Sequence, residues 1–249
     1  MSLSANITTK NPTRRASNRN QPKPKKETKM IKSTKILNNG TQFFIPAAAY
    51  QAVNMARSKE ETRYYLCGVF LHNTGSGLCL VATDGHILLK YDLPAAAFVG
   101  DQVTDDQLKD DTAGAILNFD VMEKAFKAKI HGDNELWIYG DTATGIAEFV
   151  TVEHHGRAEY PRVGVTEFDI VDGSYPDYRR VIPSTFSDDA GVFAFDPDLI
   201  AIFSKARKFV SPEKRAAISI KPSEEFAPAL IEFSQAPELI GVLMPMRMT

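Results

Sequence analysis

Apolar and polar positions follow the same order three times along the chain: a short strand, a helix and then three more strands. The first repeat predicts a strand over 41–46, a helix over 47–59, and strands over 63–71, 78–83 and 87–91. Pro46 stops the first strand, and Ala49, Val53 and Ala56 give the helix an apolar stripe. The glycines at 75, 77 and 85 predict turns between the later strands.

The second and third repeats have the same layout. In the second, strands are expected over 115–119, 135–139, 145–151 and 167–171, with a helix over 121–130 that starts at Asp120 and an exposed loop around 154–157. In the third, strands are expected over 191–195, 217–220, 229–233 and 239–246, with a helix from Asp196-Pro197 to about Val210. The predicted fold is therefore α+β, built from three β-α-β-β-β units.

A proline-bounded stretch, residues 172–183, joins the second repeat to the third. Asp172-Gly173 predicts a turn, and Pro176 and Pro183 favour a stiff, extended connector rather than a helix. One interpretation is an ordinary linker. The alternative is a connector that packs on both neighbours through Tyr175 and Tyr178, because purely spacing linkers lack paired aromatic residues. Grooves between domains are favoured binding sites, so this stretch is where we expect one.

The net charge of −2 hides an asymmetry between a basic tail and an acidic body. Ten of the 29 basic residues and one of the 31 acidic residues lie in 1–35, which leaves 19 basic and 30 acidic residues, a net −11, for the rest. With Pro12, Pro22 and Pro24 and few large apolar residues, 1–40 is expected to be a disordered tail. Such a tail can bind phosphates, fold back on the acidic body or aid solubility.

Several classes of protein have no support in the sequence. No apolar run reaches the length of a membrane helix, and no secretory signal is evident. The common enzyme motifs are absent, and the adjacent pair His154-His155 makes a poor chelate, so we expect no enzyme, metal or cofactor. Cys67 and Cys79 are expected to be reduced, buried thiols, which favours the cytoplasm.

Basic residues gather near the ends of the predicted helices. Solvated helix faces explain such residues in most proteins, because cations are favoured at helix C-termini. The alternative is that the helices face a phosphate backbone without reading bases, since the body is otherwise acidic. The residues expected to face DNA on this hypothesis are Arg57, Lys59, Lys124, Lys127, Lys205, Arg207 and Lys208.

Three further motifs are Val81-Ala82-Thr83-Asp84-Gly85-His86, the connector Gly173-Ser174-Tyr175-Pro176-Asp177-Tyr178-Arg179-Arg180-Val181-Ile182-Pro183, and the terminal Met244-Pro245-Met246-Arg247. They resemble motifs of the bacterial β sliding clamp family, the β subunit of DNA polymerase III. Arg63-Tyr64-Tyr65-Leu66 also matches, with Gly68 two residues on. The resemblance covers about 41–249 and implies a DNA clamp fold in which one complete clamp domain is followed by a half-domain.

The resemblance also implies a domain plan. Residues 41–183 correspond to the family's middle domain and 184–249 to the second half of its last domain, which makes this a shortened member lacking the first domain and half of the third. The surfaces that close the family's dimeric ring lie in those missing parts, so its usual dimer is put in doubt. Ile87, where the family has arginine, and the extension at Met248-Thr249 are departures.

By the same resemblance, the pocket for client peptides lies between the middle and last domains. The implied pocket residues are Leu66, Thr83, Gly85, His86, Leu88, Pro176, Arg180, Val181, Val242, Met244, Pro245 and Met246. Apolar and thioether side chains of this kind form an adaptable surface for hydrophobic peptides.

The function expected is that of a sliding-clamp-like processivity factor in the cytoplasm, at the nucleoid. Its expected partners are a DNA polymerase, other proteins with clamp-binding motifs, duplex DNA without sequence specificity, and further copies of the chain; a clamp loader stays open as a partner. The alternative is an adaptor or decoy that binds the same clients without forming a ring on DNA.

Overall fold

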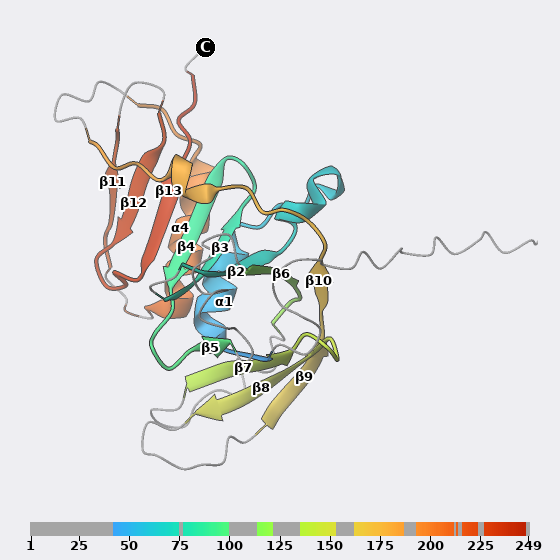
Figure 1. Ribbon diagram of the computed structural model, residues 1–249. Coiled ribbons are helices and arrows are strands. Elements are labelled where there is room, and N and C mark those ends of the chain that lie inside the picture. The colour runs from blue at the N-terminus through green and yellow to red at the C-terminus, as the bar shows by residue number, and fades with distance from the viewer. Residues whose placement is uncertain are drawn as a thin grey trace, which may run out of the picture. The chain divides into compact units, whose positions relative to one another are not determined.

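Two antiparallel sheets hold the strands that the structure describes (Figure 1). The structure, a computed structural model, describes residues 42–74, 77–99, 114–121, 135–152, 162–186, 193–211, 213, 216–223 and 227–247. The five-stranded sheet has the order β5-β1-β7-β8-β9. Its strands are β1 (Gln42–Pro46), β5 (Phe98–Val99), β7 (Glu135–Asp141), β8 (Ile146–Val152) and β9 (Arg162–Glu167).

The second sheet has eight strands in the order β10-β6-β2-β3-β4-β13-β12-β11. They are β2 (Val69–Asn73), β3 (Leu78–Thr83), β4 (Ile87–Asp92), β6 (Gly114–Asn118), β10 (Asp169–Val171), β11 (Ile218–Lys221), β12 (Ala229–Phe233) and β13 (Leu239–Leu243). The described helices are α1 (Ala47–Asn54), α4 (Pro197–Val210) and two 3₁₀ segments, Glu61–Leu66 and Tyr178–Val181.

Three repeated units are recognisable in this arrangement, and we call them unit one (42–99), unit two (114–171) and unit three (193–247). Units one and two exchange their first strands: β1 pairs with β7 of unit two, and β6 pairs with β2 of unit one. The mixed α+β architecture predicted from the sequence is confirmed by these sheets and helices.

Unit three joins unit one through a single continuous sheet. Strand β13 pairs antiparallel with β4, and Leu88 lies opposite Val242 in this pairing. Figure 1 shows the strands of unit three beside β4. The sheet therefore runs across the boundary expected at 183/184, while the division of the chain into 1–40, 41–183 and 184–249 stays a prediction.

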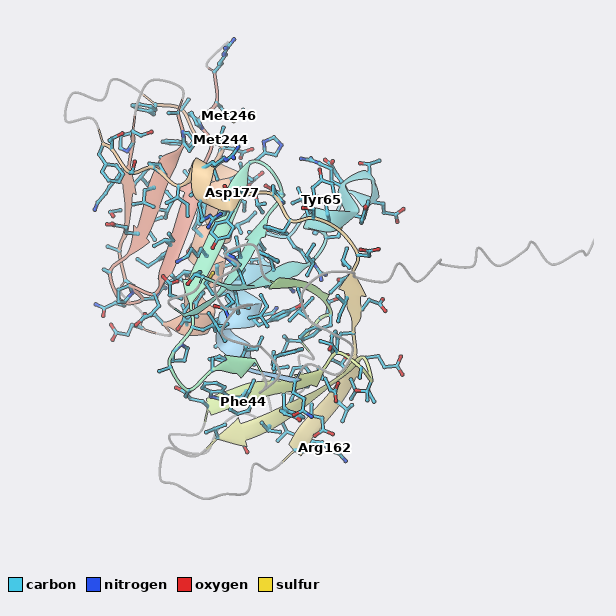
Figure 2. All side chains as sticks on the ribbon, viewed as in Figure 1. Phe44, Tyr65, Arg162, Asp177, Met244 and Met246 are labelled. Atoms are coloured by element: carbon cyan, nitrogen blue, oxygen red, sulfur yellow. The ribbon has the colours of Figure 1, made fainter. Side chains whose placement is uncertain are left out.

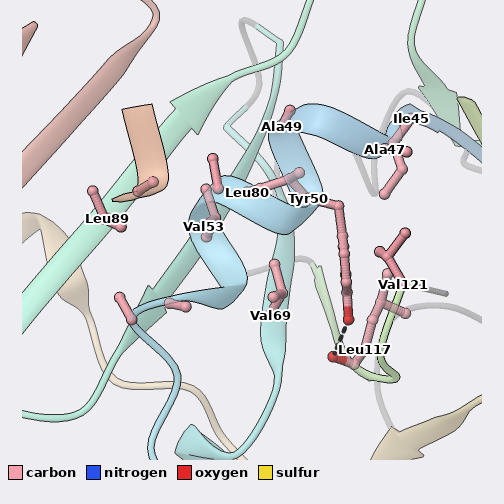
Figure 3. Packing of buried hydrophobic residues seen from close by; sticks show 14 of the residues in the cluster. Ile45, Ala47, Ala49, Tyr50, Val53, Val69, Leu80, Leu89, Leu117 and Val121 are labelled. Atoms are coloured by element: carbon pink, nitrogen blue, oxygen red, sulfur yellow. Dashed lines mark hydrogen bonds between the residues drawn. The ribbon is translucent and has the colours of Figure 1, made fainter. Parts of the chain in front are cut away.

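Helix α1 lies in the core and packs against α4 and both sheets. Its residues Ala47, Ala49, Tyr50, Ala52 and Val53 are buried, and its eight residues include no charged side chain. The Tyr50 hydroxyl donates to the carbonyl oxygen of Leu117 at 3.3 Å, which Figure 3 shows, and to that of Phe119 at 3.1 Å. Burial raises the pKa of the Tyr50 hydroxyl, so this bond to unit two persists across the physiological range.

Helix α4 begins and packs as the sequence predicts. The Asp196 side chain accepts a hydrogen bond from the Asp198 amide at 2.8 Å, with Pro197 in the first turn. Phe203 and Ala206 are fully buried. A Cβ built on Gly241 of β13 would lie 2.5 Å from the Phe203 ring, so only glycine lets the helix approach the strand this closely.

Several expectations about elements were wrong or only partly right. The strand expected over 167–171 is the end of β9 and the short strand β10, and the strand expected over 239–246 ends at Leu243. The strand expected over 63–71 is a 3₁₀ segment, Glu61–Leu66, before β2, and a bidentate contact from Arg63 to Glu60 holds its first turn. The helix expected over 47–59 ends at Asn54. The connector contains a 3₁₀ turn at Tyr178–Val181 instead of being fully extended. The strand expected over 191–195 is an isolated bridge at Ala194.

The tail over 1–40, the helix expected over 121–130 and the loop around 154–157 lie outside the described residues or almost entirely so.

Candidate functional site

The junction of β4 and β13 brings the turn at 83–86 beside the end of the chain's last strand. Leu88 and Val242 are opposite each other and each is 2% exposed, so they form a floor rather than a contact surface. Beyond them, the Met244 amide donates to the His86 carbonyl at 3.0 Å. Met244 and Met246 then project outward, 37% and 51% exposed.

The turn before β4 is held by its own side chains. The Thr83 hydroxyl donates to the Ile87 carbonyl at 2.6 Å and accepts from the Gly85 amide at 3.0 Å. The Asp84 carboxylate accepts from the amides of His86 at 2.8 Å and Ile87 at 2.9 Å. Thr83 and Asp84 thereby satisfy the turn's amides, which fixes the backbone that carries the exposed His86 side chain.

Glycine is favoured at position 85 by its backbone conformation. Its φ of +95° lies in the left-handed region, where L side chains are strained. A Cβ would also lie 2.7 Å from Nη1 of Arg63, which belongs to the 3₁₀ segment Glu61–Leu66. The turn and that segment are therefore in close contact.

The connector covers the face of the eight-stranded sheet opposite α1. On this face Phe70, Cys79, Val81, Leu88, Ile116, Tyr178 and Val242 form one buried cluster, against which Tyr65, Val171, Tyr175 and Ile182 pack. The Tyr175 ring stacks on Phe70 with centroids 4.6 Å apart and planes at 9°. The expectation that the connector packs on both neighbours is confirmed in part: its tyrosines contact β2 and β3, and unit three contributes Val242 to the cluster.

Tyr178 anchors the connector in this cluster through a polar contact. Its hydroxyl lies 2.8 Å from Nδ1 of His72 and 3.3 Å from Sγ of Cys79, and all three side chains are buried. Burial is the main cause that raises the pKa values of the Cys79 thiol and the Tyr178 hydroxyl. The thiol and the hydroxyl are therefore held neutral, as hydrogen-bonding groups beneath the connector.

Tyr175 differs from Tyr178 in its polar environment. Its hydroxyl is buried near the backbone of Thr83, and among the described residues it has no partner with hydrogen-bond geometry. Burial raises the pKa of this hydroxyl, so it stays protonated. A buried hydroxyl without a partner lowers the free energy of unfolding. Tyr175 and Tyr178 can therefore be compared by experiment, because the Tyr178 hydroxyl is hydrogen-bonded and the Tyr175 hydroxyl has no such bond to a described residue.

The exposed rim of the connector is charged. The Asp177 carboxylate accepts from Nε of Arg179 at 2.8 Å and Nε of Arg180 at 3.2 Å, and the bond from Arg179 is the main cause that lowers the pKa of Asp177. Val181 follows, 42% exposed. Figure 2 shows Asp177 at the 3₁₀ turn over the sheet and Met244 and Met246 beyond the end of β13.

The structure thus separates the expected pocket residues into layers. The floor consists of buried residues of the junction, Leu88 and Val242, and a further buried residue, Leu66, lies in the 3₁₀ segment Glu61–Leu66. The outward residues form what we call the junction surface: Gly85, His86, Pro176, Arg180, Val181, Met244 and Met246. Thr83 and Pro245 are half-buried between the two.

Sequence reasoning did not assign His72, Cys79, Tyr175 and Tyr178 to the site. The paired tyrosines of the connector were the available signal. Nothing local in the sequence relates Tyr178 to His72, because the contact joins positions 106 residues apart.

The residues expected to face DNA have different surroundings. Lys205 and Lys208 lie on the exposed side of α4. Arg207 does not, and this expectation was wrong: its side chain is buried, and Nη1 donates to the carbonyls of Ser211 and Glu213, both at 3.0 Å. It caps the end of α4, where a buried cation is stabilised by carbonyl oxygens.

Arg57 and Lys59 are not on α1, because that helix ends before them. Arg57 pairs with the Asp120 carboxylate at 2.8 Å and donates to the Asn118 side chain at 3.3 Å, which joins units one and two. Lys59 is exposed, and Lys124 and Lys127 lie outside the described residues.

Within the described ranges, no group of three or more His, Cys, Asp or Glu side chains is placed to hold a metal ion. Cys67 and Cys79 are free thiols. None of the helices that the structure describes is long and apolar enough to span a membrane.

Comparison with known proteins gives the following relatives. The sequence is 29% identical over 170 residues, 66% of this chain, to the beta sliding clamps of two strains of Caulobacter vibrioides, NA1000 / CB15N and ATCC 19089 / CIP 103742 / CB 15. The chain spans 39% of the length of each of these relatives. No family model matches the sequence.

Solved structures of clamps share the fold. A DnaN sliding clamp (DNA polymerase III subunit beta) from Bartonella birtlesii, bound to griselimycin, matches with a TM-score of 0.50 at 23% identity, over 84% of this chain and 66% of that one. The sliding clamp from Bacillus subtilis matches with a TM-score of 0.52 at 15% identity, over 84% of this chain and 64% of that one. The chain therefore has the DNA sliding clamp fold, and its sequence is similar to that of bacterial β sliding clamps.

Proposed function

We propose that this chain is a clamp-like processivity factor of DNA replication whose junction surface binds the hydrophobic segments by which DNA polymerases and other clamp-binding proteins attach. The observation that carries the proposal is the pairing of β4 with β13, which holds the turn at 83–86 beside Met244 and Met246. The similarity to β sliding clamps supports the same conclusion. On this proposal the protein is an accessory factor, not an enzyme.

The junction surface suits an extended apolar peptide with a polar end. Met244, Met246 and Val181 are exposed apolar side chains, and exposed apolar residues that cluster on a folded domain mark interaction sites. Thioether side chains adapt to different apolar partners. His86 and Arg180 lie in the same surface and offer hydrogen-bond donors to backbone carbonyls or to an acidic residue of the peptide.

The surface is held in place before any peptide binds. The turn at 83–86 is fixed by its own hydrogen bonds, and the connector is anchored through Tyr178. A preorganised surface loses little conformational entropy on binding, so a short peptide can bind with useful affinity.

DNA contact is the other half of the proposal. Lys205 and Lys208 are the described helix residues that support it, because both are exposed on α4 and can neutralise phosphates without reading bases. Lys59, Lys124, Lys127 and the basic tail are proposed as further contacts. We place the protein in the cytoplasm, at the nucleoid. A clamp loader is a further candidate partner.

An adaptor that binds the same peptides without encircling DNA is the second candidate. It is favoured by the surroundings of two residues expected to face DNA: Arg57 is paired with Asp120, and Arg207 is buried. Cations that are paired or buried add little electrostatic attraction for duplex DNA.

Topological retention on DNA separates the two candidates. The protein would be incubated with nicked circular DNA, with a loader from the same source where one is needed, and passed over a sizing column at raised salt. A clamp is retained on the circle and released when the circle is linearised. An adaptor elutes free in both cases, although it still binds a clamp-binding peptide.

A further inference from the structure

In units one and two, the first strand is paired on both of its sides. Strand β1 pairs with β5, the short strand after β4 at the end of unit one, and with β7 of unit two. Strand β6 likewise pairs with β10, the short strand after β9 at the end of unit two, and with β2 of unit one. The two units therefore complete each other by exchanging first strands.

Unit three shows only the first of these two pairings. Its first segment, 193–195, pairs at Ala194 with Met246, which follows β13, and the Met246 amide donates to the Ala194 carbonyl at 2.7 Å. In the part of the chain that the structure describes, no strand takes the position that β7 has beside β1. Strand β11, the counterpart of β7, is the last strand of its sheet among the described residues.

The side chains at these two edges are half-buried where their counterparts are buried. Phe193 and Phe195 precede the first residue of α4 as Phe43 and Ile45 precede α1, and Phe43 and Ile45 are both fully buried. Phe193 and Phe195 are only half-buried and stack on each other, with centroids 6.2 Å apart. An aromatic pair left half-exposed at a strand position indicates a missing neighbour.

Strand β11 shows the same difference from β7. Ile218 and Ile220 are half-buried, whereas Leu136 and Ile138 of β7 are 4% and 0% exposed. The Ser234 amide donates to the Ala217 carbonyl at 3.0 Å, so this pair is hydrogen-bonded. Because hydrogen-bonded and non-hydrogen-bonded pairs alternate, the backbone groups of Ile218 and Ile220 point to the open edge.

We propose that a second copy of this chain completes unit three. Segment 193–195 of each copy pairs with β11 of the other across a two-fold axis, as β1 pairs with β7 and β6 with β2 within one chain. Phe193 and Phe195 of one copy then cover Ile218 and Ile220 of the other. The dimer then has two such strand pairings, one on each side of the two-fold axis. They form together, because an isologous contact uses the same pair of surfaces on both copies.

The pairing of the two copies does not require peptide binding at the junction surface, although segment 193–195 is bonded to Met246 of that surface. The open edge of β9 is a weaker candidate for self-association, although Val163 and Val165 are 36% and 42% exposed there. The register between β8 and β9 shifts at Phe149/Val150, and a bulge of this kind hinders the pairing of an edge strand. A direct contact of β11 with β11 would leave the phenylalanine pair uncovered.

The test is the mass of the full chain in solution, by analytical ultracentrifugation over a concentration series. The wild type should sediment at twice the 27.5 kDa of the chain or at a multiple of that. Phe193→Asp places a charge in the contact between the two copies, and Ile220→Pro removes an amide that points to the open edge of β11. Each substitution should halve the sedimenting mass, whereas Val165→Asp on β9 should leave it unchanged.

Mixing the two variants gives a sharper test. In a dimer of one Phe193→Asp copy and one Ile220→Pro copy, both substitutions lie in the same strand pairing. The second pairing, between the other segment 193–195 and the other β11, is unchanged. The mixture should therefore recover part of the association that each variant alone lacks. Circular dichroism and melting of each variant check that it is folded, and binding of a clamp-binding peptide checks the junction surface separately.

A wild type that is monomeric at all concentrations would overturn the inference. So would a mixture that stays monomeric when both variants are folded, because reciprocal exchange requires complementation. A mass that falls with Val165→Asp but not with Phe193→Asp would place the contact on β9 instead and would also refute it.

Discussion

The Tyr178 hydroxyl lies 2.8 Å from Nδ1 of His72, a hydrogen bond that ties the connector to β2 from beneath the junction surface. The same hydroxyl lies 3.3 Å from Sγ of Cys79 on β3. Since Arg180 and Val181 follow Tyr178 closely, the orientation of this part of the junction surface depends on a contact that no peptide would touch.

Tyr178→Phe keeps the ring and removes this tie. Loss of a hydrogen bond between buried groups should lower the free energy of unfolding by about 1–3 kcal/mol and weaken peptide binding, because Arg180 and Val181 become less ordered. Denaturant unfolding and fluorescence anisotropy measure the two effects.

The matched control is Tyr175→Phe. This hydroxyl is buried without a well-formed hydrogen bond, so its removal should be neutral or stabilising. A larger loss of stability for Tyr175→Phe than for Tyr178→Phe would contradict the assigned roles of the two tyrosines.

The ion pairs of Asp177 predict a pH dependence. The pKa of Asp177 is lowered from its ordinary value of 3.8, chiefly by the hydrogen bond from Arg179. A lowered pKa in the folded state means that the carboxylate contributes stability above 3.8 and that this contribution is lost as the pH falls through the folded-state value. The difference in melting temperature between wild type and Asp177→Asn should therefore shrink below that pH.

Raised salt should reduce the same difference at neutral pH, since the groups are solvent-exposed. A difference that stays constant on acidification would mean that Asp177 acts through its hydrogen-bonding shape and not through its charge.

Gly85→Ala should damage both stability and the site. The left-handed backbone costs an L residue about 1–2 kcal/mol. The new methyl group would also meet Nη1 of Arg63, but this flexible side chain can move aside, so backbone strain is the main effect on the turn that carries His86. Chemical unfolding and peptide titration of the same sample would show both losses.

Gly77→Ala provides the comparison for that variant, because a Cβ at Gly77 meets nothing within 4 Å. Its unfolding free energy should stay within about 0.5 kcal/mol of the wild type. Equal effects of the two substitutions would show that backbone strain at position 85 is unimportant.

Lys205→Glu with Lys208→Glu should weaken duplex DNA binding and flatten its dependence on salt, because the variant neutralises fewer phosphates and so releases fewer counterions. Stability should change little, since both side chains are exposed. Arg207→Gln should behave in the opposite way: it removes hydrogen bonds to buried carbonyls and destabilises the fold by about 1–3 kcal/mol. DNA binding that follows Arg207 and ignores both lysines would reverse this assignment.

The local elements of the chain could largely be predicted from its sequence. Helix α4 starts and ends where its cap and its last apolar residue indicate, and β12 has the expected bounds. Local patterns failed where tertiary contacts decide: the apolar run after Arg63 becomes a 3₁₀ segment, and Arg207 turns inward to carbonyl groups that no sequence pattern reveals.

For the candidate site, the motifs indicated which segments form it but not which of their side chains are buried and which are exposed. Leu88 and Val242 look like contact residues in the sequence, yet they face each other beneath the surface. Their burial depends on the pairing of β4 with β13, which are separated by most of the chain. Long-range pairing of this kind leaves no local periodicity from which it could be predicted.

The measurement that tests the central claim most directly is the titration of a labelled clamp-binding peptide, taken from the polymerase of the same source, into wild type and Met244→Ser/Met246→Ser. The wild type should bind, a peptide with its apolar residues replaced by serine should not, and the double variant should bind at least about tenfold more weakly, or ~1.4 kcal/mol, at an unchanged melting temperature. Equal affinity of wild type and the folded double variant would show that the junction surface is not the peptide site.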